Sequence, residues 1–132
     1  WEIGGHTASH AHLPRLTPDG IREEIASGRR MLEDRLARSI ASFAYPYGEF
    51  DERCVALAAE MGFASAWTMI PTTNPPGCGL LTLGRFNCDR IRSEDPETAE
   101  LALRTYVSGR YDVYALVTAR RIRVRGRRPK GR

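Results

Sequence analysis

Apolar and polar positions along the first third of the chain follow the spacing of a strand and then of a helix. Residues 1–3 form a short apolar run that stops at a pair of glycines, a pattern typical of the end of a buried strand. A helix is expected to begin at Pro18, because Thr17 supplies an N-cap hydroxyl and Asp19 places an acid in the first turn. This helix is expected to reach about Arg38, and its apolar stripe consists of Ile21, Ile25, Leu32 and Leu36.

The middle of the chain predicts a further strand, helix and strand. Residues 42–45 form an apolar segment that ends at the Pro-Tyr-Gly sequence of residues 46–48, which is typical of a turn. Asp51 is expected to cap a second helix that stops at Gly62, since aspartate favours the N-cap and glycine the C-terminal end. Residues 63–68 then predict a third strand. The positions of the second helix that are expected to be buried are Val55, Leu57, Ala58 and Met61.

The order strand, helix, strand, helix, strand is typical of parallel βαβ units whose helices lie outside the sheet. Residues 70–79 contain three prolines and two glycines and are expected to form a loop. One further strand is expected within residues 80–89, and a last helix over residues 95–107. Three or four strands cannot close a barrel, so a small open sheet and a portion of a larger (β/α) barrel both stay open. The abrupt apolar start at Trp1 favours the barrel portion, with its first strands preceding that residue.

Length and composition are those of one globular domain, with 132 residues of which 42% are apolar and 27% charged. No apolar stretch approaches the roughly 20 residues that cross a bilayer, so no transmembrane segment is expected. The net charge of +4 arises from residues 120–132, which carry eight basic and no acidic side chains. We therefore expect a domain at residues 1–119 and a basic, flexible tail at 120–132. The tail has no aromatic residue to stack on bases, so no nucleic acid is expected as a partner, although binding of the tail to nucleic acid or an anionic surface stays open as an alternative.

The cysteines do not form a recognisable metal or redox motif. Cys54, Cys78 and Cys88 include no C-x-x-C pair, which excludes a zinc ribbon and a dithiol redox motif. Cys54 lies on the apolar side of the second predicted helix, so we expect it to be a small core residue.

All three histidines lie within a stretch of seven residues that follows the first predicted strand. His6 and His10 are four positions apart, a spacing at which a helical turn or tight loop directs two imidazoles at one cation. Neutral imidazole binds zinc, and also cobalt, nickel or iron. A catalytic zinc needs a third protein ligand, and His12 is one candidate through the His10-x-His12 spacing. The alternative is that these are surface or hydrogen-bonded histidines without a metal.

The Pro46-Tyr47-Gly48 sequence is the second place where chemistry is expected. Proline fixes one backbone angle and glycine frees another, so the Tyr47 amide is able to face a substrate as an oxyanion donor does. Loops that follow parallel strands share one rim of the sheet, which predicts that this turn lies near the histidines. The ring of Tyr45 is expected either in the core or at the rim, and Trp67 either in the core or in a sugar-stacking wall.

Two motifs together resemble a known family. HTASH at residues 6–10 and AYPYG at residues 44–48, with a helix opening LTPDGIREEI between them, resemble motifs of the polysaccharide deacetylases. These are also called NodB-homology or carbohydrate esterase family 4 domains. The resemblance covers about residues 1–68, and RFNCD, the last helix and SGRYDVY resemble short bacterial members more loosely.

The resemblance implies both a fold and an activity. The fold would be an α/β one, the C-terminal portion of a distorted (β/α) barrel of the NodB type. The activity would be that of a hydrolase that uses a divalent metal to remove acetyl groups from N-acetylglucosamine polymers, peptidoglycan, chitin-like oligomers or acetylated xylan. The implied partner is an acetylated polysaccharide or oligosaccharide, in the cell envelope or outside the cell, with a cytoplasmic location left open and no oligomeric state predicted.

The resemblance also implies roles for single residues. His6 and His10 match the two metal-binding histidines, with zinc as the expected metal and cobalt or nickel as alternatives. Tyr47 matches the tyrosine whose backbone amide helps to hold the oxyanion. Substrate contacts are expected from Thr7, Tyr45, Pro46 and Trp67, of which Thr7 matches the hydroxyl residue between the two histidines.

The sequence departs from the family pattern at three places. The Thr-Phe-Asp-Asp type motif, which supplies the base and the third metal ligand, does not occur and is expected before Trp1. Ala44 stands where members often have an arginine, and no histidine follows His12 to form the late Leu-x-His motif. We therefore expect an incomplete catalytic unit that is inactive alone. The alternative is a non-catalytic carbohydrate-binding or interaction domain of the same fold.

Overall fold

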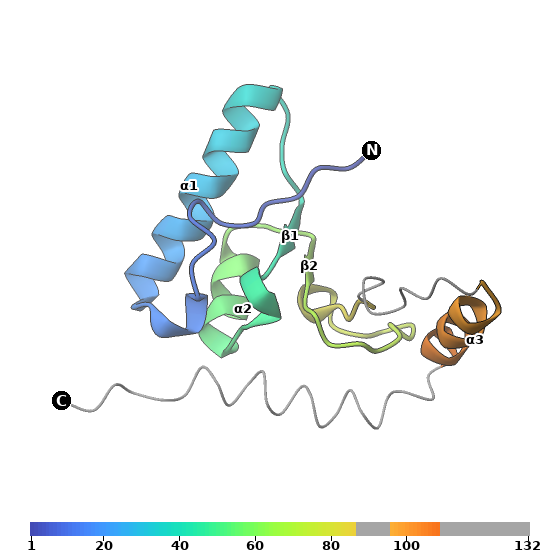
Figure 1. Ribbon diagram of the computed structural model, residues 1–132. Helices are drawn as coiled ribbons and strands as arrows, with labels where there is room; N and C mark the ends of the chain where they lie inside the picture. The colour runs from blue at the N-terminus through green and yellow to red at the C-terminus, as the bar shows by residue number, and fades with distance from the viewer. Residues whose placement is uncertain (87–95, 109–132) are drawn as a thin grey trace.

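The computed structural model describes residues 1–86 and 96–108 of the chain. Helices and short strands alternate along the described residues (Figure 1). In chain order the elements are η1 (Leu13–Arg15), α1 (Pro18–Leu36), β1 (Ser42–Ala44), η2 (Pro46–Gly48), α2 (Glu52–Glu60), β2 (Ser65–Trp67), η3 (Leu80–Thr82) and α3 (Pro96–Val107), where η marks a 3-10 helix. The predicted tail at 120–132 and the domain boundary at residue 119 lie outside the described residues.

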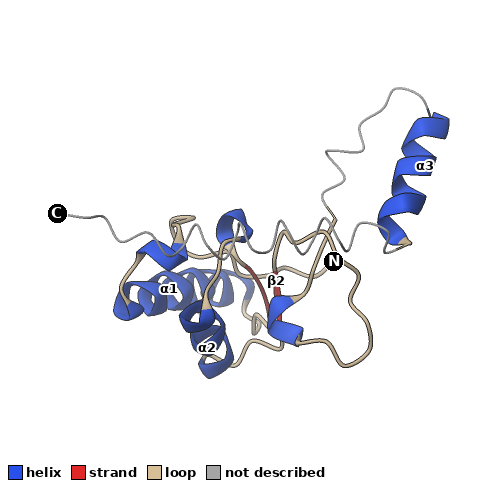
Figure 2. Ribbon diagram, turned by 90° about the horizontal axis from the view of Figure 1, so that it is seen from below, coloured by secondary structure: helices blue, strands red, loops and turns tan. Residues whose placement is uncertain are grey.

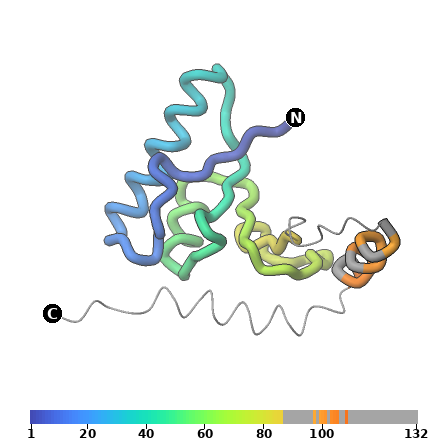
Figure 3. Tube along the Cα trace, in the orientation of Figure 1, coloured from blue at the N-terminus to red at the C-terminus, as the bar shows by residue number. Residues whose placement is uncertain are grey.

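The strands β1 and β2 pair in parallel, with Phe43 opposite Ala66. One further residue pairs in parallel on each side of them, Gly5 beside Phe43 and Leu83 beside Trp67. Figure 3 shows the N-terminal segment passing next to β1, where backbone hydrogen bonds of 2.8 and 2.9 Å hold Gly5 in place. These pairings confirm the predicted parallel βαβ arrangement in the described part of the chain. With two strands, that part does not establish a barrel.

The strand predicted at residues 1–3 is wrong, and the one expected within residues 80–89 is reduced to the single bridge at Leu83 in the described part of that range. Residues 1–3 form no strand, and Trp1 and Ile3 are exposed, because this segment pairs with β1 only at Gly5. Residues 80–82 form η3 instead of a strand, because the amide of Thr82 donates to the Gly79 carbonyl at 3.1 Å and closes a turn. Residues 87–89 of that predicted strand lie outside the described ranges.

Both long helices begin where their caps were expected. The side chains of Thr17 and Asp51 accept backbone N–H bonds in the first turns of α1 and α2, respectively. Helix α1 ends at Leu36, two residues earlier than predicted, because Ala37 adopts a left-handed φ of 51°. Leu36 itself is exposed, so the apolar stripe of α1 leaves the core after Leu32.

Helices α1 and α2 lie on the same side of the two strands, as Figures 1 and 2 show from perpendicular directions. Cys54 is fully buried, as predicted, and burial raises the pKa of its thiol to about 12, so the thiol stays protonated at neutral pH. Val55 and Met61 are only partly buried at the edge of the core. The core consists of Leu13, Ile21, Ile25, Ile40, Phe43, Tyr45, Phe50, Cys54, Leu57, Ala58, Phe63 and Ala66.

Side chains of both strands alternate between two faces. The central residues Phe43 and Ala66 are buried, and the residues on either side of them are half-buried. The last helix, α3, begins at Pro96 and ends at Val107, as predicted to within one residue, and its Leu101 and Leu103 are exposed. Within the described ranges, none of the helices combines the length and apolar character that crossing a membrane requires.

Candidate active site

Two loops that follow parallel segments of the sheet lie side by side. The first, which we call the histidine loop (residues 6–12), follows Gly5, and the second is the turn η2 after β1. His6 joins them, because its ring Nδ1 lies 2.7 Å from the carbonyl oxygen of Ala44. The prediction that the two loops share one rim of the sheet is therefore confirmed.

His6 and His10 are neighbours within the histidine loop. Their ring centroids are 4.7 Å apart and the ring planes are inclined by 68°. Two imidazoles bound to one zinc at about 2.0–2.1 Å have centroids roughly 5 Å apart, so the pair fits a shared cation. A carbonyl oxygen only accepts hydrogen bonds, so Nδ1 of His6 donates to Ala44, and Nε2 is the ring nitrogen left to face a metal.

A third ligand is not present beside this pair among the residues that the structure describes. The described residues contain no group of three or more His, Cys, Asp or Glu side chains able to hold a metal ion. His12, the candidate third ligand, instead places its Nδ1 2.8 Å from Oε2 of Glu49. The two remaining histidines thus fit part of a coordination sphere, and a catalytic zinc needs at least one more protein ligand.

The carboxylate of Glu24 on α1 holds the histidine loop against the helix. It accepts two hydrogen bonds from Ser9, at 2.9 Å from the backbone nitrogen and 2.8 Å from Oγ. The Glu24 backbone carbonyl also accepts from the amide of Ala8 at 3.0 Å. Burial acts to raise the pKa of the Glu24 carboxyl, but the hydrogen bonds from Ser9 outweigh it and the pKa is lowered. Glu24 is not recognisable from the sequence, because its partner lies 15 residues away and no local pattern marks the contact.

Gly28, one turn further along α1, allows this close approach. A Cβ at this position would lie 2.5 Å from the carbonyl carbon of Thr7 and 2.6 Å from its oxygen. Glycine costs about 1 kcal/mol relative to alanine inside a helix, so its presence in α1 is a sequence signal of such a contact. Thr7 in turn accepts a 3.0 Å hydrogen bond from the amide of His10, and both residues have positive φ values of 65° and 59°.

Replacing Glu24 by glutamine is expected to loosen the histidine loop and to remove a pH-dependent part of the stability. The native pKa of Glu24 lies below its ordinary value of 4.5. The ionised carboxylate therefore stabilises the fold above pH 4.5, and this stabilisation is lost as the pH falls through the native pKa. Urea unfolding between about pH 6 and about pH 2 checks this, since wild type and Glu24→Gln should differ near neutrality and converge in acid. A difference that stays constant over this range would contradict the assigned role.

Tyr47 has a left-handed backbone conformation, with φ of 57° and ψ of 6°. This conformation costs a non-glycine residue about 1–2 kcal/mol, and such residues concentrate at functional sites. The next two amides bond back into the turn, Gly48 to the Tyr45 carbonyl at 2.9 Å and Glu49 to the Pro46 carbonyl at 3.1 Å. The Tyr47 amide, in contrast, meets no acceptor in the described part of the chain, so it is available to donate to a ligand.

The ring of Tyr47 lies between two histidines. It meets His10 edge-on at a centroid distance of 4.4 Å and stacks on His12 at 4.0 Å, with 9° between the planes. Tyr47, whose amide is available for a ligand, and the candidate metal ligand His10 are therefore in direct contact through their rings.

The residues expected to contact a substrate differ in exposure. Tyr45 has no exposed surface, its hydroxyl donates to the Leu81 carbonyl at 2.9 Å, and burial raises the pKa of that hydroxyl well above its usual range. Pro46 is also buried, so both residues support the turn from the core and offer no surface to a ligand. Thr7 and Trp67 are half-buried and remain accessible.

An open pocket of about 390 Å³ lies beside His6. Trp67 and Arg85 line it, and Arg85 is fixed by a 2.9 Å hydrogen bond from Nε to the Thr68 carbonyl. The pocket thus brings an indole and a guanidinium next to one candidate metal ligand.

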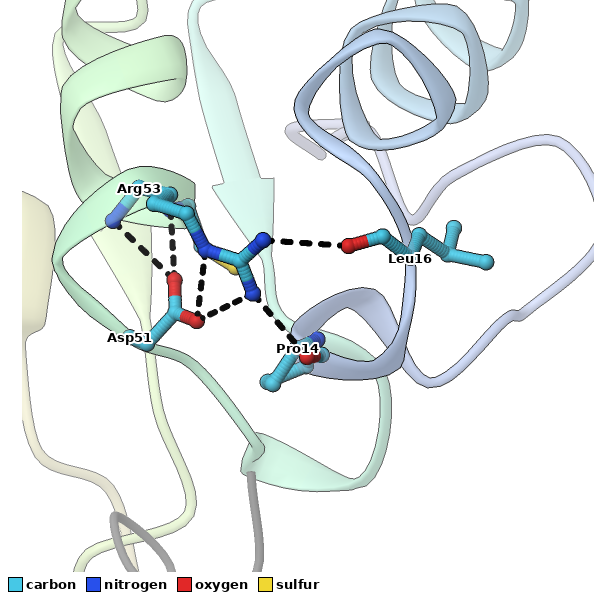
Figure 4. A network of polar contacts seen from close by, with 5 residues as sticks. Pro14, Leu16, Asp51 and Arg53 are labelled. Carbon is cyan, nitrogen blue, oxygen red and sulfur yellow. Dashed lines mark hydrogen bonds and ion pairs between the residues drawn. The ribbon is translucent and has the colours of Figure 1, made fainter. Parts of the chain in front are cut away.

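Arg53 ties the bases of the two loops together (Figure 4). From the first turn of α2, its guanidinium donates to the carbonyls of Leu16 at 3.1 Å and Pro14 at 3.0 Å, just after the histidine loop. It also donates to Asp51, the cap of α2 that follows η2, at 2.8 Å. Burial acts to raise the pKa of Asp51, but the hydrogen bond from Arg53 helps to lower it overall. One side chain therefore fixes the spacing between the segments that follow the two loops.

The sequence profile of the polysaccharide deacetylase family matches residues 1–66, half of the chain, and this part contains both the histidine loop and η2. The chain therefore belongs to the polysaccharide deacetylase family. Membership confirms the resemblance that HTASH and AYPYG indicate.

Single relatives agree with this assignment. Chitin deacetylase 1 from Cryptococcus neoformans is 37% identical over 68 residues, which are 51% of this chain and 14% of that protein. Deacetylase PplD from Streptococcus pyogenes, solved with acetate, aligns with a TM-score of 0.61 and 25% identity over 63% of this chain and 37% of its own. A polysaccharide deacetylase from Bacillus cereus gives a TM-score of 0.54 and 28% identity over 64% of this chain and 27% of its own. The chain thus spans well under half of the length of these relatives, and the likeness supports a NodB-type fold for the matched part.

Proposed function

We propose that this chain is the part of a metal-dependent polysaccharide deacetylase that supplies two histidine ligands and an oxyanion donor. The observation that carries the proposal is the joint position of His6, His10 and Tyr47. The two imidazoles are 4.7 Å apart, the Tyr47 ring is 4.4 Å from His10, and the Tyr47 amide meets no acceptor among the described residues. Family membership supports acetylated polysaccharide as the substrate class.

Hydrolysis of an acetamide adds a hydroxyl to the acetyl carbon and a proton to the departing amine. A divalent cation, zinc in the first instance and cobalt or nickel as alternatives, supplies a Lewis acid that lowers the pKa of water and polarises the carbonyl. His6 and His10 would hold the cation, and the hydrogen bond from His6 Nδ1 to Ala44 would orient its ring. The Tyr47 amide would donate to the carbonyl oxygen as negative charge develops, and loss of one such donor costs about 10²–10³ in kcat.

The remaining parts of the site are proposed to lie outside the described residues. The described residues contain no group of three His, Cys, Asp or Glu side chains that could hold a metal ion, so the third metal ligand has to come from elsewhere in the protein. Glu49 is the acidic residue nearest to Tyr47 in sequence, but it is buried and already accepts from His12, so it does not serve as the base. By this proposal the described residues form an incomplete catalytic unit.

Metal titration tests the ligand proposal. His6→Ala and His10→Ala are each expected to weaken Zn²⁺ binding by at least about tenfold, because each removes one of two ligands. Isothermal titration calorimetry on metal-free protein measures the affinity, and the absorption spectrum of bound Co²⁺ reports imidazole coordination. His12→Ala, the same substitution within the same loop, is the matched control and should leave the affinity nearly unchanged. Equal losses in all three variants would contradict the assignment of ligands.

Turnover of N-acetylglucosamine oligomers with zinc supplied tests the incompleteness. This chain is expected to be inactive alone, and a form extended by the residues that precede Trp1 is expected to be active. Equal, robust turnover by both would show that nothing essential is missing. Oligomer binding that persists without metal and in His10→Ala would instead favour the non-catalytic carbohydrate-binding alternative.

A further inference from the structure

His12 and Glu49 form a pair beside Tyr47 that the proposed chemistry leaves unused. The ring Nδ1 of His12 donates to the Glu49 carboxylate, with 2.8 Å between Nδ1 and Oε2. The side chain of Glu49 is only 8% exposed, and that of His12 is 33% exposed. In the described part of the chain, the Glu49 carboxylate meets no other hydrogen-bond donor. Because an unpaired carboxylate is costly to bury, Glu49 depends on His12.

The pair acts directly on the ring of Tyr47. The hydrogen bond to Glu49 fixes the direction of Nδ1 and with it the plane of the His12 ring. That ring lies flat on Tyr47, at a centroid distance of 4.0 Å and an angle of 9°. The edge contact with His10, at 4.4 Å, holds the Tyr47 ring from another direction. The ring is thus held between a candidate metal ligand and the His12–Glu49 pair.

Tyr47 needs such support because its own backbone does not favour the conformation it has. A φ of 57° lies in the left-handed region, which residues other than glycine rarely adopt. The φ of Tyr47 is also one of the two backbone angles, with the ψ of Pro46, that set the direction of the Tyr47 N–H. Contacts that fix the ring therefore also fix the amide.

A merely structural role would be to join the two loops, and other residues already do this. Arg53 bonds to the carbonyls of Pro14 and Leu16 and to Asp51, as Figure 4 shows. Asp51, and not Glu49, caps α2. What remains particular to the His12–Glu49 pair is its contact with Tyr47.

We propose that His12 and Glu49 are positioning residues that hold the Tyr47 ring, so that the Tyr47 amide stays directed at the space beside His6 and His10. They act through Tyr47 and touch neither substrate nor metal. The consequence for turnover rests on the proposed function. The conformational order of the Tyr47 amide does not depend on the proposed function, and it is therefore the first quantity to measure.

NMR of the metal-free, ¹⁵N-labelled chain provides this test. The order parameter of the Tyr47 amide is expected to be about 0.85 in the wild type and below about 0.6 in Glu49→Ala. Glu49→Gln should restore the wild-type value, since its side-chain oxygen still accepts from His12. If Glu49→Ala does not fold, His12→Leu makes the same test, because it fills space but removes both the hydrogen bond and the stacking.

Arg53→Ala is the matched control, because it removes contacts at the base of the loops and leaves the pair intact. It is expected to lower stability and to leave the Tyr47 amide ordered. An unchanged Tyr47 amide in both Glu49→Ala and His12→Leu would overturn the proposal. Equal disorder of Tyr47 in Arg53→Ala would also overturn it, because the pair would then act only as one of several loop contacts.

Two further measurements separate this inference from the proposed function. Zinc affinity should be the same in Glu49→Ala as in the wild type, and a loss there would assign the pair to the metal site and refute a role through Tyr47. In a form of the protein that turns over, Glu49→Ala should lower kcat by about tenfold with KM unchanged. Failure of the wild type to bind zinc would remove the proposed function and leave the NMR result on Tyr47 standing.

Discussion

Replacing Gly48 with alanine is expected to lower the free energy of unfolding by about 3 kcal/mol. Two costs add up at this position. Gly48 has a φ of 67°, and a Cβ there would lie 2.6 Å from Cβ of Met69 and 2.7 Å from its backbone nitrogen. Because the backbone after β2 cannot retreat as a flexible side chain can, the turn that carries Tyr47 has to move. Urea unfolding followed by circular dichroism measures the loss.

Gly62→Ala is the matched control for this change. Gly62 also has a positive φ, of 77°, but no atom lies within 4 Å of the position its Cβ would take. Gly62→Ala should therefore lower the free energy of unfolding only by the cost of the left-handed backbone, about 1 kcal/mol. The difference between the two variants isolates the contact between Gly48 and Met69, and equal losses would refute that contact.

Gly28→Ala is expected to move the histidine loop away from α1. The added Cβ would meet backbone atoms of Thr7 at 2.5 and 2.6 Å and the Ala8 nitrogen at 2.9 Å. Overpacking of this kind costs about 1–3 kcal/mol, of which the better helix propensity of alanine recovers about 1 kcal/mol. Since the same loop carries His6 and His10, we expect zinc affinity to fall at least about tenfold together with stability. Calorimetric zinc titration and urea unfolding of the same sample measure both.

The control for Gly28→Ala is the same substitution at the start of the same helix. In Gly20→Ala the new Cβ would meet side-chain atoms of Leu16 and Thr17 at 3.3 Å, which are able to yield by a few tenths of an ångström. This variant should keep both its stability and its zinc affinity. If Gly28→Ala behaves in the same way, the histidine loop is not held at the distance that the structure gives.

The helices are predictable from sequence because their signals are local. Thr17 and Asp51 act on amides within the next turn, and the short-range pattern finds both. The strands expected at residues 1–3 and within residues 80–89 depend on neighbours that a short apolar run does not specify. At the second of these, the bond from Thr82 to Gly79 closes a turn before any pairing begins.

The candidate site likewise contains residues that local sequence patterns predict and residues that they do not. His6, His10 and Tyr47 stand in short motifs, so their meeting at one rim follows from the parallel βαβ order. The residues that hold them in place, Glu24 and Glu49, contact partners 15 and 37 residues away, and no local pattern reveals such pairs. Gly28, in the interior of α1, is a sequence signal that another segment comes close to the helix, but it does not identify that segment.

The contacts of Arg53 link the stability of the two halves of the site. Its guanidinium bonds to Pro14, Leu16 and Asp51, so fraying of the first turn of α2 releases the segments behind both loops at once. We therefore expect the segments that follow the two loops to open together, with a common free energy of local unfolding. A population of molecules with the histidines in place and the Tyr47 turn detached is correspondingly small.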